Sequence, residues 1–259
     1  MIQKGRLDTK RQRLLFILLV AMLMVVVFSA MAHADLTVVG TGTMAGVAGS
    51  YNLIYDSAQN ITWLDYLAPV NTWQNQMAWA QNLAVNFKGQ NVTGWSLPTA
   101  VDDGSYPNNF SFNGTTSYGY NNTSSQMGYL FYTDLGNKGY YDKNGNPQSG
   151  WGLTNTRPFK SLIALSTSGN SGYLSSTGDA ARPDLEWVFG FTYGDQTMYY
   201  KTNASVALAV HPGNIVATTP PPPSSTTPVG YSPTWLIITL MSLTLAGGYL
   251  MREKGWRVN

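Results

Sequence analysis

The sequence contains no cysteine, and it is poor in charge and in histidine. Charged residues make up 11% of the 259 residues, and only two histidines occur. The lack of cysteine excludes disulfide bonds, thiol catalysis and cysteine-ligated zinc. Few side chains are therefore available for acid–base or metal chemistry. Without disulfide bonds, a folded domain of this composition depends on its hydrophobic core for stability.

Residues 1–34 have the pattern of a secretory signal peptide. A basic head (Lys4, Arg6, Lys10, Arg11, Arg13) precedes an apolar run over residues 14–30, and Ala32-His33-Ala34 ends the segment. This order of basic, apolar and small residues is typical of exported proteins. We predict cleavage before Asp35. An uncleaved anchor is the alternative, because the apolar run is about as long as a minimal transmembrane helix.

The C-terminal region has the pattern of a stalk and a membrane segment. A Pro-, Thr- and Ser-rich linker at 218–234 precedes the apolar residues 235–251, which are followed by Arg252, Lys254 and Arg257. Trp235 and Tyr231 are placed as interfacial aromatics, and the basic end favours the cytoplasmic side. We predict a transmembrane helix that anchors the chain to a membrane at least transiently; a helix buried in the globular domain is the alternative.

The remaining residues 35–217 form one predicted domain. It carries seven basic and eleven acidic side chains, a formal net charge of −4, although the whole chain has a net charge of +2. The basic character thus belongs to the two terminal segments. A nucleic-acid partner is not expected, because such proteins need a basic surface on the folded part.

The domain is rich in Gly, Asn, Ser, Thr and aromatic residues, which favours a loop-rich fold. We predict strands at 51–56 and 61–65 joined by a turn, and further strands at 186–193 and 204–210. Helices are predicted from Asn71 or Thr72 to about Phe87, with Trp73, Met77, Ala80, Ala84 and Phe87 inward, and over 125–135, capped by Ser124 and ended by Gly136. Residues 100–123 form a long polar loop, and loops of that length are usually functional or disordered.

Seven segments resemble, in order, a bacterial family of unknown function, the Lcl C-terminal domain. They are residues 53–64 (LIYDSAQNITWL), 77–80 (MAWA), 94–99 (GWSLPT), 127–132 (MGYLFY), 172–177 (GYLSST), 187–191 (WVFGF) and 207–213 (ALAVHPG). The resemblance implies an α+β, C-type-lectin-like domain with two helices and short antiparallel sheets. Ser96, Leu174 and His211 depart from the family pattern, which has Arg, Trp and Arg there. If those positions form a ligand site in the family, this chain has lost part of it.

The tail is similar to sorting tails of the PEP-CTERM and IPTL-CTERM type. This resemblance implies an exosortase-like processing enzyme as a partner. The chain has no Pro-Glu-Pro sequence, and residues 231–235 (YSPTW) only loosely match the start of an IPTL tail. Simple anchoring by the helix is the alternative.

Catalytic and metal-binding residues are not expected. His211, the single histidine of the domain, stands at the end of a predicted strand. Asp184 or Glu186 with Asp195 could supply two carboxylates for glycoside hydrolysis, but solvated charges at a strand edge are the simpler interpretation. Residues 142–146 (DKNGN) resemble part of a calcium loop but lack its final Glu. We predict a type I′ turn at Asn144-Gly145 and no cofactor, with calcium as the alternative.

Aromatic side chains in the long loops are the predicted ligand contacts. We expect Trp73, Trp79 and Trp187 in the core, and Trp151 exposed between two glycines. The predicted ligand-binding residues are Trp151, Tyr106, Tyr118 and Tyr120, on the loops 100–123 and 138–151. The sequence therefore predicts an exported bacterial protein that binds a glycan or a surface protein without catalysis. A hydrolase and a structural component of an extracellular matrix are the alternatives.

Overall fold

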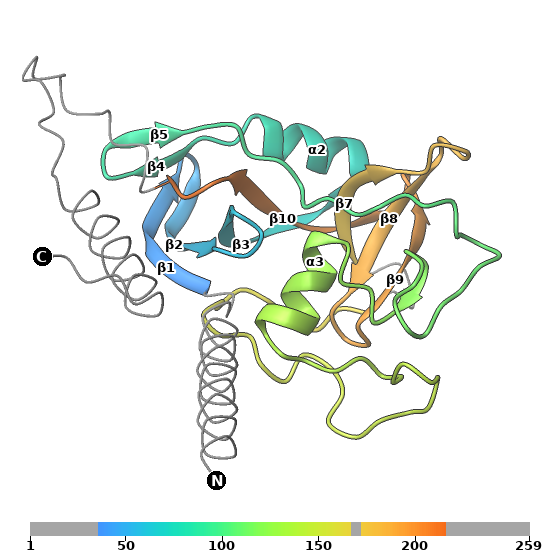
Figure 1. The fold of residues 1–259 in the computed structure, drawn as a ribbon. Coiled ribbons are helices and arrows are strands. Elements are labelled where there is room, and N and C mark those ends of the chain that lie inside the picture. Colours follow the sequence, from blue (N-terminus) through green and yellow to red (C-terminus); the bar gives the residue numbers. More distant parts are fainter. Residues whose placement is uncertain (1–35, 167–171, 216–259) are drawn as a thin grey trace, which may run out of the picture. The chain divides into compact units, whose positions relative to one another are not determined.

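The strands of the domain form one mixed sheet. The computed structural model describes residues 36–166 and 172–215. Ten strands lie in the order β5-β4-β1-β2-β3-β10-β7-β8-β9-β6, with two short helices against them (Figure 1). The predicted signal peptide, linker and transmembrane helix lie outside the described residues. Within the described ranges, no helix is long and apolar enough to cross a membrane.

The first half of the sheet is an antiparallel meander. Strands β1 (Leu36–Met44), β2 (Val47–Asp56) and β3 (Ile61–Thr72) follow one another, and β4 (Val85–Phe87) and β5 (Gln90–Val92) extend the β1 edge. The predicted hairpin at 51–65 is confirmed, with longer strands. Asp56 forms its turn by accepting hydrogen bonds from the backbone N–H groups of Ala58 and Gln59 at 3.1 and 3.0 Å.

The second half contains β7 (Tyr173–Gly178), β8 (Leu185–Gly190), β9 (Asp195–Tyr200) and β6 (Gly119–Tyr120), all antiparallel. Strand β10 (Ala204–Pro212) joins the halves. It pairs with β3 antiparallel over most of its length and with β7 in parallel at Val206 and Tyr173. The predicted strands at 186–193 and 204–210 correspond to β8 and β10.

Strand β10 is buried on both faces, and its alternate side chains pack in two different hydrophobic clusters, one on each face of the sheet. Val206, Leu208 and Val210 contribute to a cluster with Phe131 on the α3 face. Ala207 lies on the other face, in a cluster that includes Ala80 of α2. Alternate residues of a strand point to opposite faces. The larger side chains of β10 therefore lie on the α3 face, and the small Ala207 lies on the α2 face. Figure 1 shows α2 and α3 on opposite sides of the sheet.

The second predicted helix is confirmed, with a wider final turn. Helix α3 (Gln126–Tyr129) continues into the π-helix η1 (Leu130–Asp134), where the Leu135 N–H donates to Leu130 O at 2.9 Å. The cap is Ser125, one residue after the predicted Ser124, and its hydroxyl accepts from the Gly128 N–H at 3.1 Å. Gly136 ends the helix with a φ of 64°.

The first predicted helix is too long. Helix α2 (Trp73–Gln81) ends early, and Val85 and Phe87 lie in strand β4. Gly40 and Gly42 of β1 leave room for them, since a Cβ at either glycine would overlap the Phe87 ring or Val85. Pairing with β1 therefore determines the structure of residues 85–87, although the spacing of apolar residues predicted a helix there. Gln76 is the buried residue of this helix together with Ala80, while Met77 is half-buried and Ala84 is exposed.

The expected α+β, C-type-lectin-like fold with short antiparallel sheets is wrong. The described domain is mostly β, with a single ten-stranded mixed sheet. Strands β1, β4, β5, β6, β7 and β9 were not predicted. Strand β1 was missed because its LTVVGTGTM sequence contains two glycines that normally weaken a strand, and here both serve close packing.

Candidate functional site

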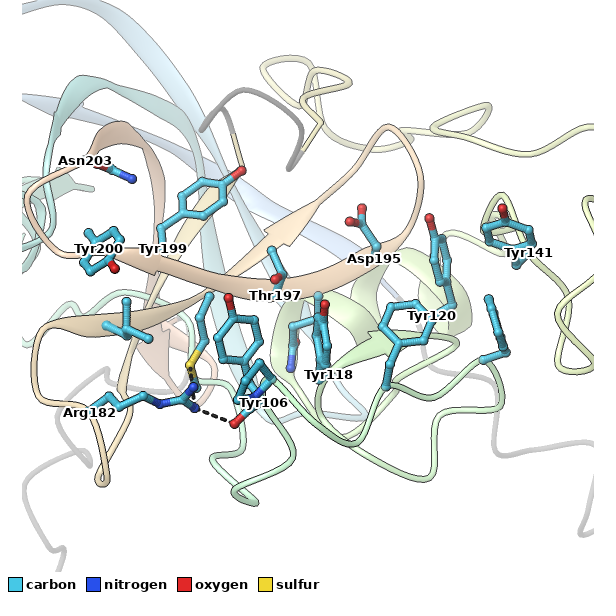
Figure 2. Close-up of a pocket in the computed structure, with 16 residues that line it drawn as sticks. Tyr106, Tyr118, Tyr120, Tyr141, Arg182, Asp195, Thr197, Tyr199, Tyr200 and Asn203 are labelled. Atoms are coloured by element: carbon cyan, nitrogen blue, oxygen red, sulfur yellow. Dashed lines mark hydrogen bonds between the residues drawn. The ribbon is translucent and has the colours of Figure 1, made fainter.

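A groove lined by aromatic rings lies beside β9 at one end of the sheet. Its volume is about 800 Å³, within the range of small-molecule sites. Eight aromatic rings line it: Tyr106, Phe110, Phe112, Tyr118, Tyr120, Tyr141, Tyr199 and Tyr200. Figure 2 shows that the side chains of β9 and of the facing loops converge on it. The polar side chains of the lining include Arg182, Asp195, Gln196, Thr197 and Asn203.

Hydrogen bonds inside the predicted long loop shape the aromatic wall. The Asp103 carboxylate accepts from the backbone N–H groups of Ser105 and Ser117 at 3.0 and 2.7 Å. Burial acts to raise the Asp103 pKa, but these bonds together lower it. The Ser105 hydroxyl accepts from the Tyr118 N–H at 3.0 Å, and the Gln196 amide donates to Ser117 O at 2.9 Å. The loop is thus ordered and tied to β9.

Arg182 fastens the other end of the loop. Its guanidinium lies 4.7 Å from the centre of the Tyr106 ring and donates to Tyr106 O at 2.6 Å (Figure 2). The same group pairs with the Asp179 carboxylate. Burial acts to raise the pKa of Asp179, but bonds from the Ala181 N–H and from Arg182 outweigh it and lower the pKa. The one cation of the groove is therefore neutralised by a neighbour and serves to hold Tyr106.

The rings pack edge to face along the groove. Tyr106 contacts Tyr118 at 4.8 Å between centroids, Tyr118 contacts Phe110 at 4.9 Å, and Phe110 contacts Phe112 at 5.0 Å. Phe112 then meets Tyr141 at 5.1 Å. Phe110 and Phe112 nevertheless keep 43% and 36% of their surface exposed. A contiguous exposed aromatic surface of this kind marks an interaction site.

Polar groups stand among the rings. Burial raises the pKa of Tyr118, and the charges of Tyr106 and Asp195 add to the effect. Burial also raises the pKa of Tyr120, again with a contribution from Asp195. Both phenols therefore stay protonated at neutral pH and can donate hydrogen bonds. Figure 2 shows Asp195 on β9 between Thr197 and Tyr120, and its Oδ1 atom is buried.

Three of the four predicted ligand-binding residues meet in this groove. Tyr106, Tyr118 and Tyr120 line it, and Trp151 does not. Trp151 is exposed, as expected, and stacks on Tyr193 at 5.3 Å and 27°. The other lining rings were missed: Phe110, Phe112, Tyr141, Tyr199 and Tyr200. The alternation FSF at 110–112, close to YGY at 118–120, is the sequence signal that could have revealed the two phenylalanines.

The considered carboxylates are not brought together. Asp184 is exposed, Glu186 is fully buried, and among the three only Asp195 lines the groove. The expectation that Glu186 is a solvated charge is wrong, because β8 is buried along its whole length. His211 lies near the end of β10, as predicted, with its ring 5.4 Å from that of Trp95.

The calcium-like segment forms a turn. The Gly145 N–H donates to Asp142 O at 3.0 Å, and the Asp142 carboxylate accepts from the N–H groups of Asn144 and Asn146. Asn144 lacks the positive φ of a type I′ turn, so that detail of the prediction is wrong. In the parts of the chain that the structure describes, no three acidic or histidine side chains gather as metal ligands.

Of the three predicted core tryptophans, one is fully buried and two are half-buried. Trp187 is fully enclosed, as are Trp63 and Trp95. Trp73 and Trp79 of α2 are half-buried against the sheet.

Comparison with known proteins finds no relative: no family model, no curated protein and no solved structure matches the chain. The resemblance in seven short segments therefore remains a prediction.

Proposed function

We propose that this domain is a non-catalytic binding module, and that its groove takes an uncharged glycan at the cell surface or outside the cell. The observation that carries the proposal is the groove itself: aromatic rings with exposed surface, interspersed with phenol and carboxylate groups. The proposed location rests on the signal-peptide and tail patterns. The C-terminal helix would anchor the protein in a membrane at least transiently, with an exosortase-like enzyme as the processing partner.

The composition of the groove supports a sugar ligand. A pyranose ring has an apolar C–H face and a rim of hydroxyls. Aromatic side chains offer both an apolar surface and, in tyrosine, a polar tip, so one wall can satisfy both parts of a sugar. Asp195 and the hydroxyls of Tyr118 and Tyr120 supply an acceptor next to donors. The lining has only one acid, and its arginine is already paired, which favours an uncharged ligand.

The groove also helps to judge the two alternative functions, a hydrolase and a structural component of an extracellular matrix. Hydrolysis by two carboxylates needs a pair about 5 to 10 Å apart, and Asp195 is the one carboxylate in this lining. A purely structural matrix component needs no discrete site. An ordered groove with exposed rings therefore favours binding over both.

The test is a glycan array with the purified full chain, followed by calorimetry on the glycans that bind. We expect Phe110→Ala to weaken binding by about tenfold, because this ring contacts Phe112, Tyr118 and Tyr120 and is still 43% exposed. Val70→Ala is the control, since Val70 is 63% exposed and lies outside the groove.

Two results would count against the proposal. If no glycan binds the wild-type chain, the ligand is of another class. If the chain releases sugar from a bound glycan, and Asp195→Asn stops the release, the protein is a hydrolase.

A further inference from the structure

The series of aromatic ring contacts continues beyond the residues that line the groove. From Tyr141 it passes to Tyr140 at 4.7 Å between centroids, then to Trp151 at 5.2 Å, and ends where Trp151 stacks on Tyr193. We call the whole series the aromatic row: Tyr106, Tyr118, Phe110, Phe112, Tyr141, Tyr140, Trp151 and Tyr193. Trp151 is 37% exposed although its ring packs against Tyr140 and Tyr193. The groove is thus one part of a longer aromatic surface.

Backbone contacts hold Trp151 in place. The Gly152 N–H donates to Lys138 O at 2.8 Å, and the Tyr140 N–H donates to Tyr193 O at 2.8 Å. The glycines on both sides of Trp151 have φ values of 69° and 98°, a region that favours glycine. The loop therefore presents the indole in a fixed position. A fixed aromatic side chain loses little conformational entropy when it binds a ligand.

We propose that Trp151 and Tyr193 form a second sugar subsite, and that the ligand is a linear neutral polysaccharide that runs along the aromatic row. This inference rests on the proposed glycan-binding function and extends it. A single sugar would occupy the groove alone, and the exposed rings beyond Tyr141 would have no ligand to contact. A chain of sugars can engage both subsites at once, and linked contacts of this kind strengthen binding without a change at either site.

Another ligand class could use aromatic rings in a similar way. Proline-rich peptides dock in aromatic grooves, but they need mainly apolar slots. The groove contains Asp195, Thr197 and Asn203 among its rings, and these polar groups match the many hydroxyls of a sugar chain. We therefore favour the polysaccharide and make the peptide an outcome of the test.

The experiment measures affinity against ligand length. The probes are β-1,4-linked glucose and N-acetylglucosamine oligosaccharides of two to six sugars, the corresponding insoluble polymers, any glycan series found on the array, and a polyproline peptide. For the sugar that binds, we expect the affinity of the wild-type full chain to rise by about tenfold from the shortest to the longest ligand. Trp151→Ala should abolish this rise, because the second subsite loses its ring.

Matched variants separate the two subsites. Trp151→Phe keeps an aromatic ring and should restore part of the length dependence. Phe110→Ala should weaken binding of every length, because all ligands use the groove. Thermal unfolding of each variant checks that the fold is intact.

The possible failures are distinct. Affinity that is independent of length, or equal length dependence in wild type and Trp151→Ala, overturns the second subsite but leaves glycan binding in the groove. Binding of the polyproline peptide without any glycan overturns both proposals, as does the absence of any glycan binding.

Discussion

At the scale of single residues, Glu186 is the most unusual group in the domain. It is fully buried in β8, and neither carboxylate oxygen has a hydrogen-bond partner among the described residues. Burial raises its pKa to about 9, although the charge of Lys201 acts in the opposite direction. The side chain is therefore neutral at physiological pH. A buried ionised carboxylate without partners would be far more costly.

This protonation predicts how stability depends on pH. The folded protein keeps the proton of Glu186 up to about pH 9, whereas the unfolded chain releases it near its ordinary pKa of 4.5. Stability should therefore fall as pH rises between these values. Glu186→Gln cannot ionise, so at pH 8 we expect it to be more stable than wild type by about 5 kcal/mol, since each pH unit above the unfolded pKa costs wild type about 1.4 kcal/mol. At pH 4 the two should be nearly equal.

Urea unfolding at several pH values measures this difference. Wild type and variant share the titration of Asp134, whose pKa is raised to about 8 by burial and by the neighbouring Asp56. The comparison must therefore use the difference between the two proteins at each pH. A difference that stays constant from pH 4 to 9 would show that Glu186 does not hold a proton in the folded state.

At the scale of elements, the loop between β5 and α3 carries the groove. Within this segment, Ser111 pairs with Gly119 in an isolated parallel bridge, and Gly119 has a φ of 129°. A Cβ at Gly119 would overlap the Ser111 carbonyl oxygen and carbon. Close approach of two backbone segments thus requires glycine at this position.

We predict that Gly119→Ala disrupts the groove while the sheet remains folded. The expected loss of stability is about 2 kcal/mol, because both the positive φ and the overlap disfavour alanine. Near-ultraviolet circular dichroism should show the loss of tyrosine packing, and far-ultraviolet spectra should stay close to wild type. Gly46→Ala is the matched control: it has a φ of 75° but no atom within 4 Å of the added Cβ. Equal effects of the two variants would assign the loss to φ alone.

Elements with local signals could be predicted from the sequence. The hairpin around Asp56 has a turn between two alternating strands, and the helix that follows Ser125 has a cap and a terminal glycine. Strand β4 was not predicted, because Ala84 and Phe87 continue the helical spacing that begins at Trp73. The close fit of Val85 and Phe87 against the glycines of β1 favours the strand. Tyr106, Tyr118 and Tyr120 were predicted from their position in a long loop. Their contacts with Phe110, Phe112 and Tyr141 depend on how that loop folds back on β9.

At the scale of the whole molecule, the sheet depends on β10. This strand joins the antiparallel meander of β1–β5 to the β7–β9 half, and it is covered on both faces. Distant segments are also linked by single side chains. The Asp65 carboxylate of β3 accepts from the backbone N–H groups of Lys160 and Ser161 at 2.9 Å each. These contacts join residues about a hundred positions apart in the sequence, so no local sequence pattern predicts them.

The processing of the chain is a prediction at this scale. Cleavage of the signal peptide should give a mature protein that begins with Asp35, because Ala32-His33-Ala34 fits the small-residue pattern of a cleavage site. Intact-mass measurement of the native protein, combined with cell fractionation, tests this. A second mass that ends near the Pro-rich linker would support removal of the tail. A tail-intact protein in the inner membrane would contradict the sorting hypothesis and support simple anchoring.

The sequence by itself determined the properties that depend on composition and on neighbouring residues: the absence of thiol chemistry, the acidic domain between two basic terminal segments, the hairpin, the second helix and the aromatic character of the long loops. Only the tertiary structure decided the mostly β fold, the burial of Glu186 and the continuity of the aromatic row. The physical reason is that strand pairing and ring packing join residues far apart in the chain, and their free energies outweigh local preferences such as the helical spacing at 84–87.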